Sequence, residues 1–409
     1  MAGRKTFVGF GFGAIQTGLF LWEAQQSGDF ERLVIALPND EVVAGLRRAE
    51  GNFCVNVATR TAREVCEIHG VEIFDPRVAR DRQALVAAIA DASEMSTALP
   101  SVETYEQPDA SVAELLAEGL RAKLRQDQPT RCILYAAENH NHAAELLRTS
   151  LSLRLAPEED QTLRTVFQPL NTVIGKMSRV VRDAAEIKEA GLQPYVDGGS
   201  RAYLVEAFNR ILVSQVTLPG FQRGIAVFAE KPDLLPFEEA KLYGHNAAHA
   251  LLGYLGRQRG LRFIAEAAAD GQLMTFVREA FLDESGRALI ARRPGVDPLF
   301  TSEGYRAFAD DLLERMVNPW LRDSVERVTR DPRRKLGWDD RLVGTMRLAL
   351  ASGIQPNRLA VGAAAALERL QSEEPTQTQA GLLDDLWANV SASSEEKHKV
   401  RSLILAAKA

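Results

Sequence analysis

Cysteine is scarce in this sequence, and its spacing argues against two kinds of site. Among 409 residues there are only three cysteines, Cys54, Cys66 and Cys132, an odd number without CxxC spacing. Such a set supports neither a disulfide framework nor a thiolate metal centre, and it fits a reducing cytoplasm. No run of about 18 apolar residues occurs, so the sequence predicts no membrane-spanning helix.

A large excess of one charge is also missing. The net charge is -6, with 25% charged and 46% hydrophobic residues. This composition is typical of a soluble globular protein and argues against nucleic acid as a partner. A single hydrophobic core usually stops growing at roughly 250 to 300 residues, so two domains are expected.

The first half alternates short apolar runs with helical periods of about 10 to 15 residues, which is typical of a parallel sheet covered on both faces. From about Phe208 onward the period is almost wholly helical. We therefore predict a Rossmann-like doubly wound α/β domain over 1–197 and a mostly α-helical domain over 198–409. The expected strands contain TFVGF, RLVIAL, EIF, EMSTAL and RCILYAAEN, and the expected helices cover 15–27, 40–50, 80–92 and 111–125.

The opening segment FVGFGFGAIQTGLFLWEA runs from a strand through several glycines into an amphipathic helix. Glycines at this turn let the backbone approach a pyrophosphate, whose charge then lies against the N-terminus of the helix. GxGxxG is not matched literally, because Gly11 and Gly13 lead to Gln16, whereas Gly9 and Gly11 lead to Ala14, which a looser form allows. A tight turn without a ligand is the alternative.

The sequence leaves the choice between NAD and NADP open. An NAD site usually has an acidic residue at the end of the second strand, but RLVIALPND has Leu37 there, with Asn39 slightly later. Arg47 and Arg48 on the next helix could favour a 2′-phosphate.

The stretch KLYGHNAAHALLGYLG places Lys241, His245, Asn246 and His249 in an apolar helical pattern. At about 100° per residue all four fit on one helix face. Partial desolvation would lower the pKa of the lysine toward neutrality, as a general base requires. Two histidines at i, i+4 could form half of a zinc site, but no glutamate follows His245. A buried polar network without catalysis is a further alternative.

Several ordered motifs resemble one family. Lys241-x4-Asn246-x2-His249, followed by ALLGYLG, resembles the signature of the polyol-specific long-chain dehydrogenases and reductases, the mannitol dehydrogenase family. GFGAIQTG is similar to the family's GxGxIxxG loop, which selects the register Gly11, Gly13, Gly18. EMSTALP, AAENHNHAA, FQPLNTVIGKMSRVV and VEAFNRILV resemble further family segments, and NPWLRDSVERVTRDPRRKLGWDDRL is especially close to the mannitol 1-phosphate branch.

The resemblance implies a zinc-independent mechanism in which Lys241 is the general acid and base. Asn139 and Asn246 would polarise the substrate oxygen, as an oxyanion hole does, and His249 would orient the lysine and a substrate hydroxyl. The implied substrate-binding residues are Arg327, Lys335 and His142, with Glu238 or Glu239 as a proton relay. The implied cofactor-binding residues are Gly11, Gly13, Ala14, Ile15, Gly18, Asn39 and Thr97.

The implied activity is hydride transfer between NAD or NADP and a polyol phosphate/ketose phosphate pair, with mannitol 1-phosphate and fructose 6-phosphate leading. The expected partner is a small sugar or polyol, with the protein a monomer or a homodimer. Three departures put the substrate in doubt: Ala137 replaces a cysteine, Gly175-Lys176 replaces Asp-Arg, and Ser214 replaces an aspartate. The alternatives are a non-phosphorylated ketose, a sugar acid or a sugar conjugate as substrate, and an inactive nucleotide-binding regulatory protein. The basic run from Arg330 to Lys335 is either a solvated helix end or a phosphate clamp.

Overall fold

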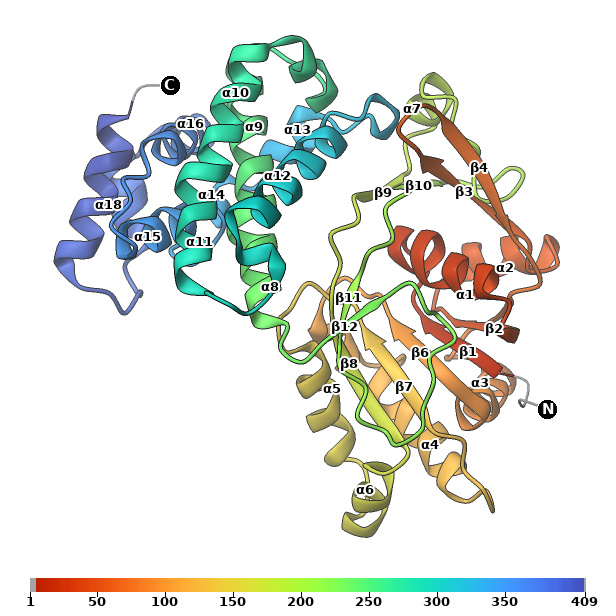
Figure 1. Ribbon diagram of the computed structural model, residues 1–409. Coiled ribbons are helices and arrows are strands. Elements are labelled where there is room, and N and C mark those ends of the chain that lie inside the picture. Colours follow the sequence, from red (N-terminus) through yellow and green to blue (C-terminus); the bar gives the residue numbers. More distant parts are fainter. Residues whose placement is uncertain (1–4, 408–409) are drawn as a thin grey trace. The chain divides into compact units, whose positions relative to one another are not determined.

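The computed structural model describes residues 5–407, which form two compact units (Figure 1). The first unit ends at Leu234 and the second begins at Leu235. The first is an α/β unit and the second is helical, which confirms the predicted fold class. None of the helices within 5–407 is long and apolar enough to cross a bilayer.

An eight-stranded sheet forms the centre of the first unit, with the order β12-β11-β8-β7-β6-β1-β2-β5. The neighbours from β8 to β5 run parallel, whereas β11 is antiparallel to β8. The chain direction across the sheet reverses between β1 and β6, which makes this the switch point of a doubly wound fold. The strands are β1 Lys5–Phe10, β2 Phe30–Ala36, β5 Glu72–Phe74, β6 Ala92–Thr97, β7 Cys132–Ala136, β8 Phe167–Val173, β11 Leu212–Ser214 and β12 Ala229–Lys231.

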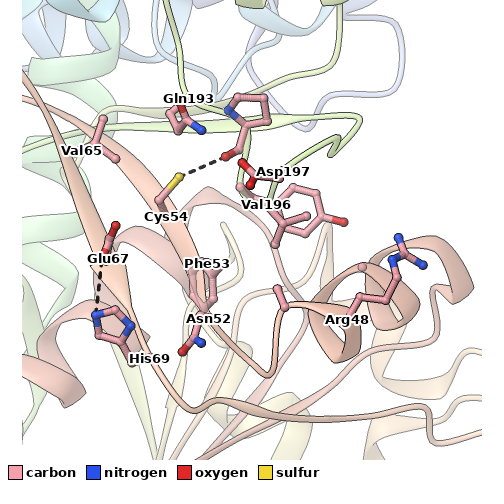
Figure 2. A pocket seen from close by; sticks show the side chains of 14 residues that line it. Arg48, Asn52, Phe53, Cys54, Val65, Glu67, His69, Gln193, Val196 and Asp197 are labelled. Carbon is pink, nitrogen blue, oxygen red and sulfur yellow. Dashed lines mark hydrogen bonds and ion pairs between the residues drawn. The ribbon is translucent and has the colours of Figure 1, made fainter.

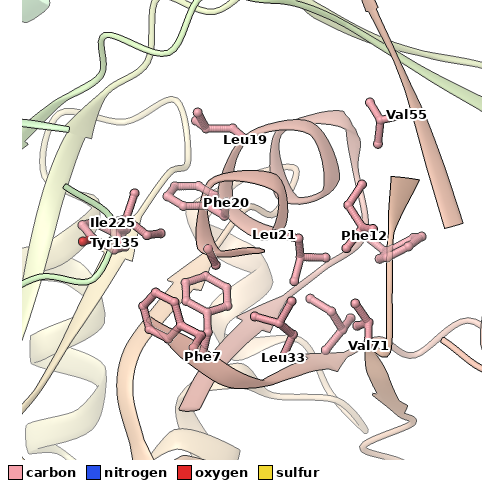
Figure 3. Packing of buried hydrophobic residues seen from close by; sticks show 14 of the residues in the cluster. Phe7, Phe12, Leu19, Phe20, Leu21, Leu33, Val55, Val71, Tyr135 and Ile225 are labelled. Carbon is pink, nitrogen blue, oxygen red and sulfur yellow. The ribbon is translucent and has the colours of Figure 1, made fainter. Parts of the chain in front are cut away.

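Alternate residues of the parallel strands enter two separate cores. Phe7 and Leu33 belong to one hydrophobic cluster, and their neighbours Val8 and Val34 belong to the other. This period of two places the clusters on opposite faces of the sheet. In the first cluster, Leu21 lies near Leu33, and Phe20 stacks on Tyr135 with ring centroids 5.7 Å apart (Figure 3). The helix that begins at the glycine loop is therefore anchored by its apolar side.

A second, four-stranded sheet has the order β4-β3-β10-β9. Its strands are β3 Phe53–Ala58, β4 Arg63–Ile68, β9 Ser178–Val181 and β10 Ala202–Glu206. The helical segments of this unit, where η denotes a 3-10 or π helix, are η1 Gln16–Leu21, α1 Trp22–Ser27, α2 Asp40–Arg48, α3 Ala79–Asp91, η2 Val102–Glu106, α4 Val112–Leu124, α5 Ala143–Ser152, α6 Pro157–Leu163 and α7 Ala184–Glu189.

The second unit is built around α9 Ala247–Gln258, which packs against α10, α13 and α16. Its other elements are α8 Leu235–Glu239, η3 Ala240–Asn246, η4 Ile264–Ala269, α10 Gly271–Glu279, η5 Ala280–Gly286, α11 Arg287–Arg292, η6 Pro298–Phe300, α12 Ser302–Met316, η7 Pro319–Leu321, α13 Val325–Thr329, α14 Pro332–Lys335, α15 Val343–Ala351, α16 Asn357–Glu373, α17 Gln379–Leu386 and α18 Ser394–Ala406.

The division between the units falls later than residue 197. β10 pairs with β3 and β9, and β11 pairs with β8 and β12, so the segment 202–231 belongs to the sheets of the first unit. The expectation of an almost wholly helical chain from Phe208 was wrong for this segment. Helices take over at Leu235.

Candidate functional site

The glycine loop lies at the switch point, between the carboxyl ends of β1 and β6. Gly11 has φ +93°, and a Cβ there would meet Ala98 O at 2.8 Å. A Cβ on Gly13 would meet nothing within 4 Å. The helix begins directly after this loop, with Thr17 N donating to Gly13 O at 3.0 Å. A tight turn, an open glycine and a helix N-terminus together make a site suited to a pyrophosphate.

The other predicted members of this loop have different surroundings. Ala14 and Ile15 form the first helical residues, so their N–H groups lie at the helix start. A Cβ on Gly18 would meet Val205 Cγ1 at 2.6 Å and Val55 Cγ1 at 3.1 Å. Gly18 therefore serves the packing of η1 against β3 and β10.

The turn after β2 contains Asn39, whose side chain caps α2 by accepting from Val42 N at 3.0 Å. Neither arginine predicted for a 2′-phosphate belongs to this turn. Arg47 bonds Asp81 and donates to Ile73 O at 3.2 Å, and Arg48 is the last residue of α2. Arg77 instead bonds Asp40 in the first turn of α2.

Thr97, at the end of β6, is buried and donates to Glu138 Oε2 at 2.9 Å. The buried Glu138 also accepts from Leu99 N at 3.0 Å and from the Tyr105 hydroxyl. Burial raises the pKa of Glu138, against the opposing effect of these bonds. The carboxylate joins the loops that follow β6 and β7. Asn139, the next residue, is exposed, so Glu138 fixes the backbone from which Asn139 projects.

A cavity of about 780 Å³ in the first unit is lined by Arg48 but by none of the other predicted residues (Figure 2). It lies at the C-terminal end of α2, around Arg48, whereas Asn39 and the turn after β2 lie at the other end of this helix. Its lining carries both charges, Arg48 opposite in sign to Glu67 and Asp197, and His69 Nε2 lies 3.6 Å from Glu67 Oε2. This cavity is separate from the glycine loop.

In the second unit, Lys241 and Asn246 belong to η3, which is a π-helix, and His249 belongs to α9. The wheel of 100° per residue therefore does not hold across η3, because a π turn contains an additional residue. Lys241, Asn246 and His249 nevertheless lie in one continuous helical run, because η3 leads directly into α9. π turns inside α-helices are frequent at functional sites.

The environment of Lys241 favours the neutral amine. Burial, followed by the positive charge of Arg341, lowers the pKa of Lys241 to about 8, and Glu238 opposes the shift. An amine with this pKa exchanges protons near physiological pH. Burial also lowers the pKa of His245 well below its usual value, with smaller contributions from His249 and Arg315. Neutral His245 therefore adds no charge beside the lysine.

The ALLGYLG part of the motif serves packing. A Cβ on Gly253 would meet Val328 Cγ1 at 2.5 Å, so this glycine lets α13 approach α9. Tyr254 also donates its hydroxyl to Thr329 O at 3.1 Å. This contact brings Arg327, on α13, to the helix that carries His249.

A buried aspartate joins these two predicted residues. His249 Nε2 lies 3.1 Å from Asp323 Oδ2, and Arg327 Nε donates to Asp323 Oδ1 at 2.6 Å. Lys335, eight residues after Arg327, is buried and donates to Arg330 O. Burial, with Arg341 and Arg334, lowers the pKa of Lys335 to about 8.

The two candidate proton relays differ in their partners. Glu239 is bound by two arginines, with Arg292 Nη2 at 3.1 Å and Arg293 Nη2 at 2.8 Å. Glu238 acts electrostatically on Lys241. These partners favour Glu238 over Glu239 as a relay.

Two of the four basic residues in this run are engaged with carboxylates of their own chain. Arg333 bonds Glu374 and Asp385, and Arg334 bonds Asp331. The pairs of Arg333 tie α14 to the end of α16 and to α17, whereas Arg334 bonds the N-cap of its own helix, so both arginines have structural partners. Across residues 5–407, no group of three or more histidine, cysteine, aspartate or glutamate side chains has an arrangement that could hold a metal ion. His142 is exposed just before α5 in the first unit, with its ring 6.2 Å from that of His140.

Three residues of these sites were absent from the sequence prediction: Glu138, Asp323 and Arg341. Each stands beside or within a quoted motif, and Asp323 precedes Arg327 by four residues, the spacing of a helical ion pair. That spacing is the sequence signal that could have identified Asp323 as the partner of Arg327. Burial and the contact with His249 come from tertiary structure.

Comparison with known proteins identifies relatives of both units. A family model described as "Mannitol dehydrogenase C-terminal domain" matches residues 233–409. Mannitol-1-phosphate 5-dehydrogenase from Bacillus licheniformis is 30% identical over 305 residues, which cover 72% of this chain and 73% of that protein.

Two solved structures share the fold over 98% of this chain. D-sorbitol dehydrogenase in substrate-free form has a TM-score of 0.74 at 17% identity, with 93% of its chain covered. Pseudomonas fluorescens mannitol 2-dehydrogenase, in ternary complex with NAD and D-mannitol, has a TM-score of 0.71 at 16% identity, with 91% covered. At these identities the likeness concerns the fold.

Proposed function

Because the chain belongs to the mannitol dehydrogenase family and is an oxidoreductase acting on CH–OH groups, we propose that it interconverts a polyol phosphate and a ketose phosphate. Mannitol 1-phosphate and fructose 6-phosphate are the first pair to test. The observation that carries the proposal is the half-buried Lys241 on a π turn, with its pKa lowered to about 8, in one helical run with Asn246 and His249.

A nicotinamide dinucleotide fits the glycine loop of the first unit. The open face of Gly13 and the helix N-terminus at Ala14 would receive the pyrophosphate, while the turn at Asn39 would face the adenosine ribose. When bound, the nicotinamide supplies the hydride acceptor or donor. NAD is the first cofactor to test. NADP is the alternative, since no carboxylate ends β2 and Arg77 bonds Asp40 in the first turn of α2.

Lys241 would move the proton. In alcohol oxidation, its neutral amine would take the hydroxyl proton as hydride leaves the neighbouring carbon, and in ketone reduction its ammonium would return that proton. Glu238, whose charge acts on Lys241, would pass the proton toward solvent. A lysine thus supplies the acid and base chemistry that a zinc-bound water supplies in other enzymes.

Two asparagine amides would stabilise the charge on the substrate oxygen, Asn246 in the second unit and Asn139 in the first. An amide donates hydrogen bonds without adding a charge. His249 and Arg327 would orient the substrate hydroxyls, and His142 would contact the substrate from the loop before α5. Each role is a prediction that substitution to alanine can test.

Positive charge supports an anionic substrate. Arg341 lowers the pKa of both Lys241 and Lys335, so three cationic side chains act on one region of the second unit. A phosphate would find guanidinium and ammonium donors there. Carboxylates already engage Arg333 and Arg334, and Arg341 Nε donates to Asp340 Oδ1 at 2.7 Å, so a phosphate would share these guanidinium groups with carboxylates.

A substrate and cofactor panel tests the proposal. Purified protein is assayed for oxidation of mannitol 1-phosphate and free polyols, and for reduction of fructose 6-phosphate and free ketoses, with each nicotinamide cofactor separately. We expect the highest kcat/KM for the phosphorylated pair. A higher kcat/KM for a free polyol, a sugar acid or a sugar conjugate would favour the alternative suggested by Ser214 and Gly175. Cofactor binding without turnover of any substrate would favour a regulatory protein.

A further inference from the structure

Asp323 connects two side chains that the proposed function places at the substrate. Its carboxylate is buried, with 4% of the residue exposed. Oδ1 accepts from Arg327 Nε at 2.6 Å, and Oδ2 accepts from Arg327 Nη2 at 2.7 Å. Oδ2 also lies 3.1 Å from His249 Nε2. His249 Nε2 is itself buried, its contact with Asp323 is within ion-pair distance but does not have hydrogen-bond geometry, and no other described residue offers it a hydrogen bond.

The backbone holds Asp323 independently of its side chain. Ile264 N donates to Asp323 O at 2.8 Å, and Phe263 and Ser324 form a β-bridge. Ser324 then caps α13 by accepting from Arg327 N at 3.3 Å. A change confined to the side chain can therefore leave the path of the chain intact.

The carboxylate is ionised in these surroundings. Burial raises the pKa of Asp323, but His249 and Arg327 outweigh burial and hold the pKa well below its usual range. An ionised carboxylate only accepts hydrogen bonds. The ring nitrogen beside it must therefore carry a hydrogen, and in a neutral imidazole the other nitrogen is then an acceptor.

We propose that Asp323 is a positioning residue that fixes His249 as the Nε2–H tautomer and holds Arg327 by the same carboxylate. This leaves Nδ1 of His249 to accept from a substrate hydroxyl or from the Lys241 ammonium. The proposal rests on the proposed function for the roles of Lys241 and His249. The state of the His249 ring itself does not depend on that function.

Asparagine at this position cannot reproduce the arrangement. An amide has one acceptor oxygen and one NH2 group, whereas Arg327 needs an acceptor at both Oδ1 and Oδ2. If the oxygen replaces Oδ1, the NH2 group opposes Arg327 Nη2 and donates to His249 Nε2, which selects the Nδ1–H tautomer. If the oxygen replaces Oδ2, the NH2 group opposes Arg327 Nε. Asp323→Asn therefore disturbs at least one of the two partners.

The first test determines which ring nitrogen of His249 is protonated in the native protein. Long-range 15N–1H correlation spectra of protein labelled at histidine, with His249 assigned by comparison with His249→Gln, report which ring nitrogen is protonated. We expect a protonated Nε2. An Nδ1–H tautomer for native His249 would overturn the proposal, whether or not the protein turns over any substrate.

The second test uses substitution in the full-length protein. We expect Asp323→Asn to lower kcat at least tenfold while cofactor binding persists, and Asp323→Glu, which keeps the charge, to recover part of the loss. Glu284→Gln is the matched control, because Glu284 is a carboxylate 2% exposed that bonds the backbone N–H groups of Arg358 and Leu359. The control is expected to keep kcat within twofold. A folded Asp323→Asn protein with native kcat and an unchanged His249 ring contradicts the proposal.

Discussion

Gln16 stands at the position where the GxGxxG pattern has its third glycine, and the structure compensates for it on the neighbouring strand. Gln16 is fully buried, and its Oε1 accepts from Ser96 Oγ at 2.9 Å. A Cβ on Gly9 would lie 2.1 Å from Gln16 Nε2 and 2.7 Å from Ile35 Cδ1. At this contact the glycine of β1 provides the space for the helix, whereas Gly18 on the helix provides the space toward β3 and β10.

This arrangement predicts that substitutions at Gly9 and Gln16 have coupled effects on the free energy of unfolding. Gly9→Ala should lower the free energy of unfolding by about 1–3 kcal/mol, because added volume in a packed core forces neighbours aside. In the double variant with Gln16→Gly, the cost of Gly9→Ala should fall by about 1 kcal/mol, since the nearest obstructing atom is gone. Urea unfolding of the four proteins measures the coupling. Additive costs would show that Gln16 does not fill the space above Gly9.

Gly13 predicts a change in binding without a change in stability. Gly13→Val places its Cβ where no described atom beyond the adjacent residues lies within 4 Å, so the free energy of unfolding should change by only about 0.5 kcal/mol. The side chain would occupy the space proposed for the pyrophosphate, so the Kd for the cofactor should rise at least tenfold, by calorimetry. Gly271→Val, at another open glycine beginning a helix, is the control. A native Kd for the cofactor in Gly13→Val would show that the cofactor does not bind at this loop.

At the scale of elements, Glu138 joins the carboxyl ends of β6 and β7. Glu138→Ala leaves Leu99 N and the hydroxyls of Thr97 and Tyr105 without their acceptor. A buried donor without a partner costs about 1–3 kcal/mol. We therefore expect a lower urea midpoint, together with a reduced kcat because the loop bearing Asn139 is less well fixed.

A second buried glutamate controls for the stability effect. Glu94, in β6, is bonded by the Tyr135 hydroxyl at 2.8 Å and by Gly224 N. Glu94→Ala should lower the urea midpoint comparably while kcat changes much less, measured well below both unfolding transitions. Equal losses of kcat in the two variants would show that Glu138 has no specific effect on turnover through the loop bearing Asn139.

The alternating elements of the first unit were predictable because their signal is local. The short apolar runs TFVGF and RLVIAL and the helical periods that follow them correspond to β1, β2, α1 and α2. β10 was not predicted as part of the first unit, because it pairs with β3 from much earlier in the chain. The π turn η3 was not predicted either, since a helical wheel carries no sign of the additional residue.

At the scale of the whole molecule, the ordered motifs predicted the family, which the comparisons confirm. They did not predict how the side chains are paired. His249 with Asp323, and Arg333 with Glu374, depend on helices brought together by packing at Gly253 and along α16. The roles assigned to Lys241 and to Asn139 stay predictions.

Cofactor binding and turnover should be separable. Lys241→Met removes the amine but no part of the glycine loop, so NAD should raise the Tm of the variant as much as that of the native protein. Cofactor at a hundred times its Kd stabilises by about 2.7 kcal/mol. The kcat should fall about 100-fold or more, as expected on loss of a general base. A variant with native kcat would show that another group moves the proton.

The pH dependence of the native enzyme tests the role of Lys241 most directly. With its pKa lowered to about 8, Lys241 is increasingly protonated below that pH. At saturating cofactor, log kcat/KM for polyol oxidation should therefore fall by about one unit per pH unit below about 8, whereas log kcat/KM for ketose reduction should fall above about 8. The predicted result is that the profile for oxidation and the profile for reduction bend in opposite directions near pH 8, and that both pH dependences are lost in Lys241→Met. Profiles that are flat between pH 6 and 10, or that persist in Lys241→Met, would contradict a lysine general acid and base.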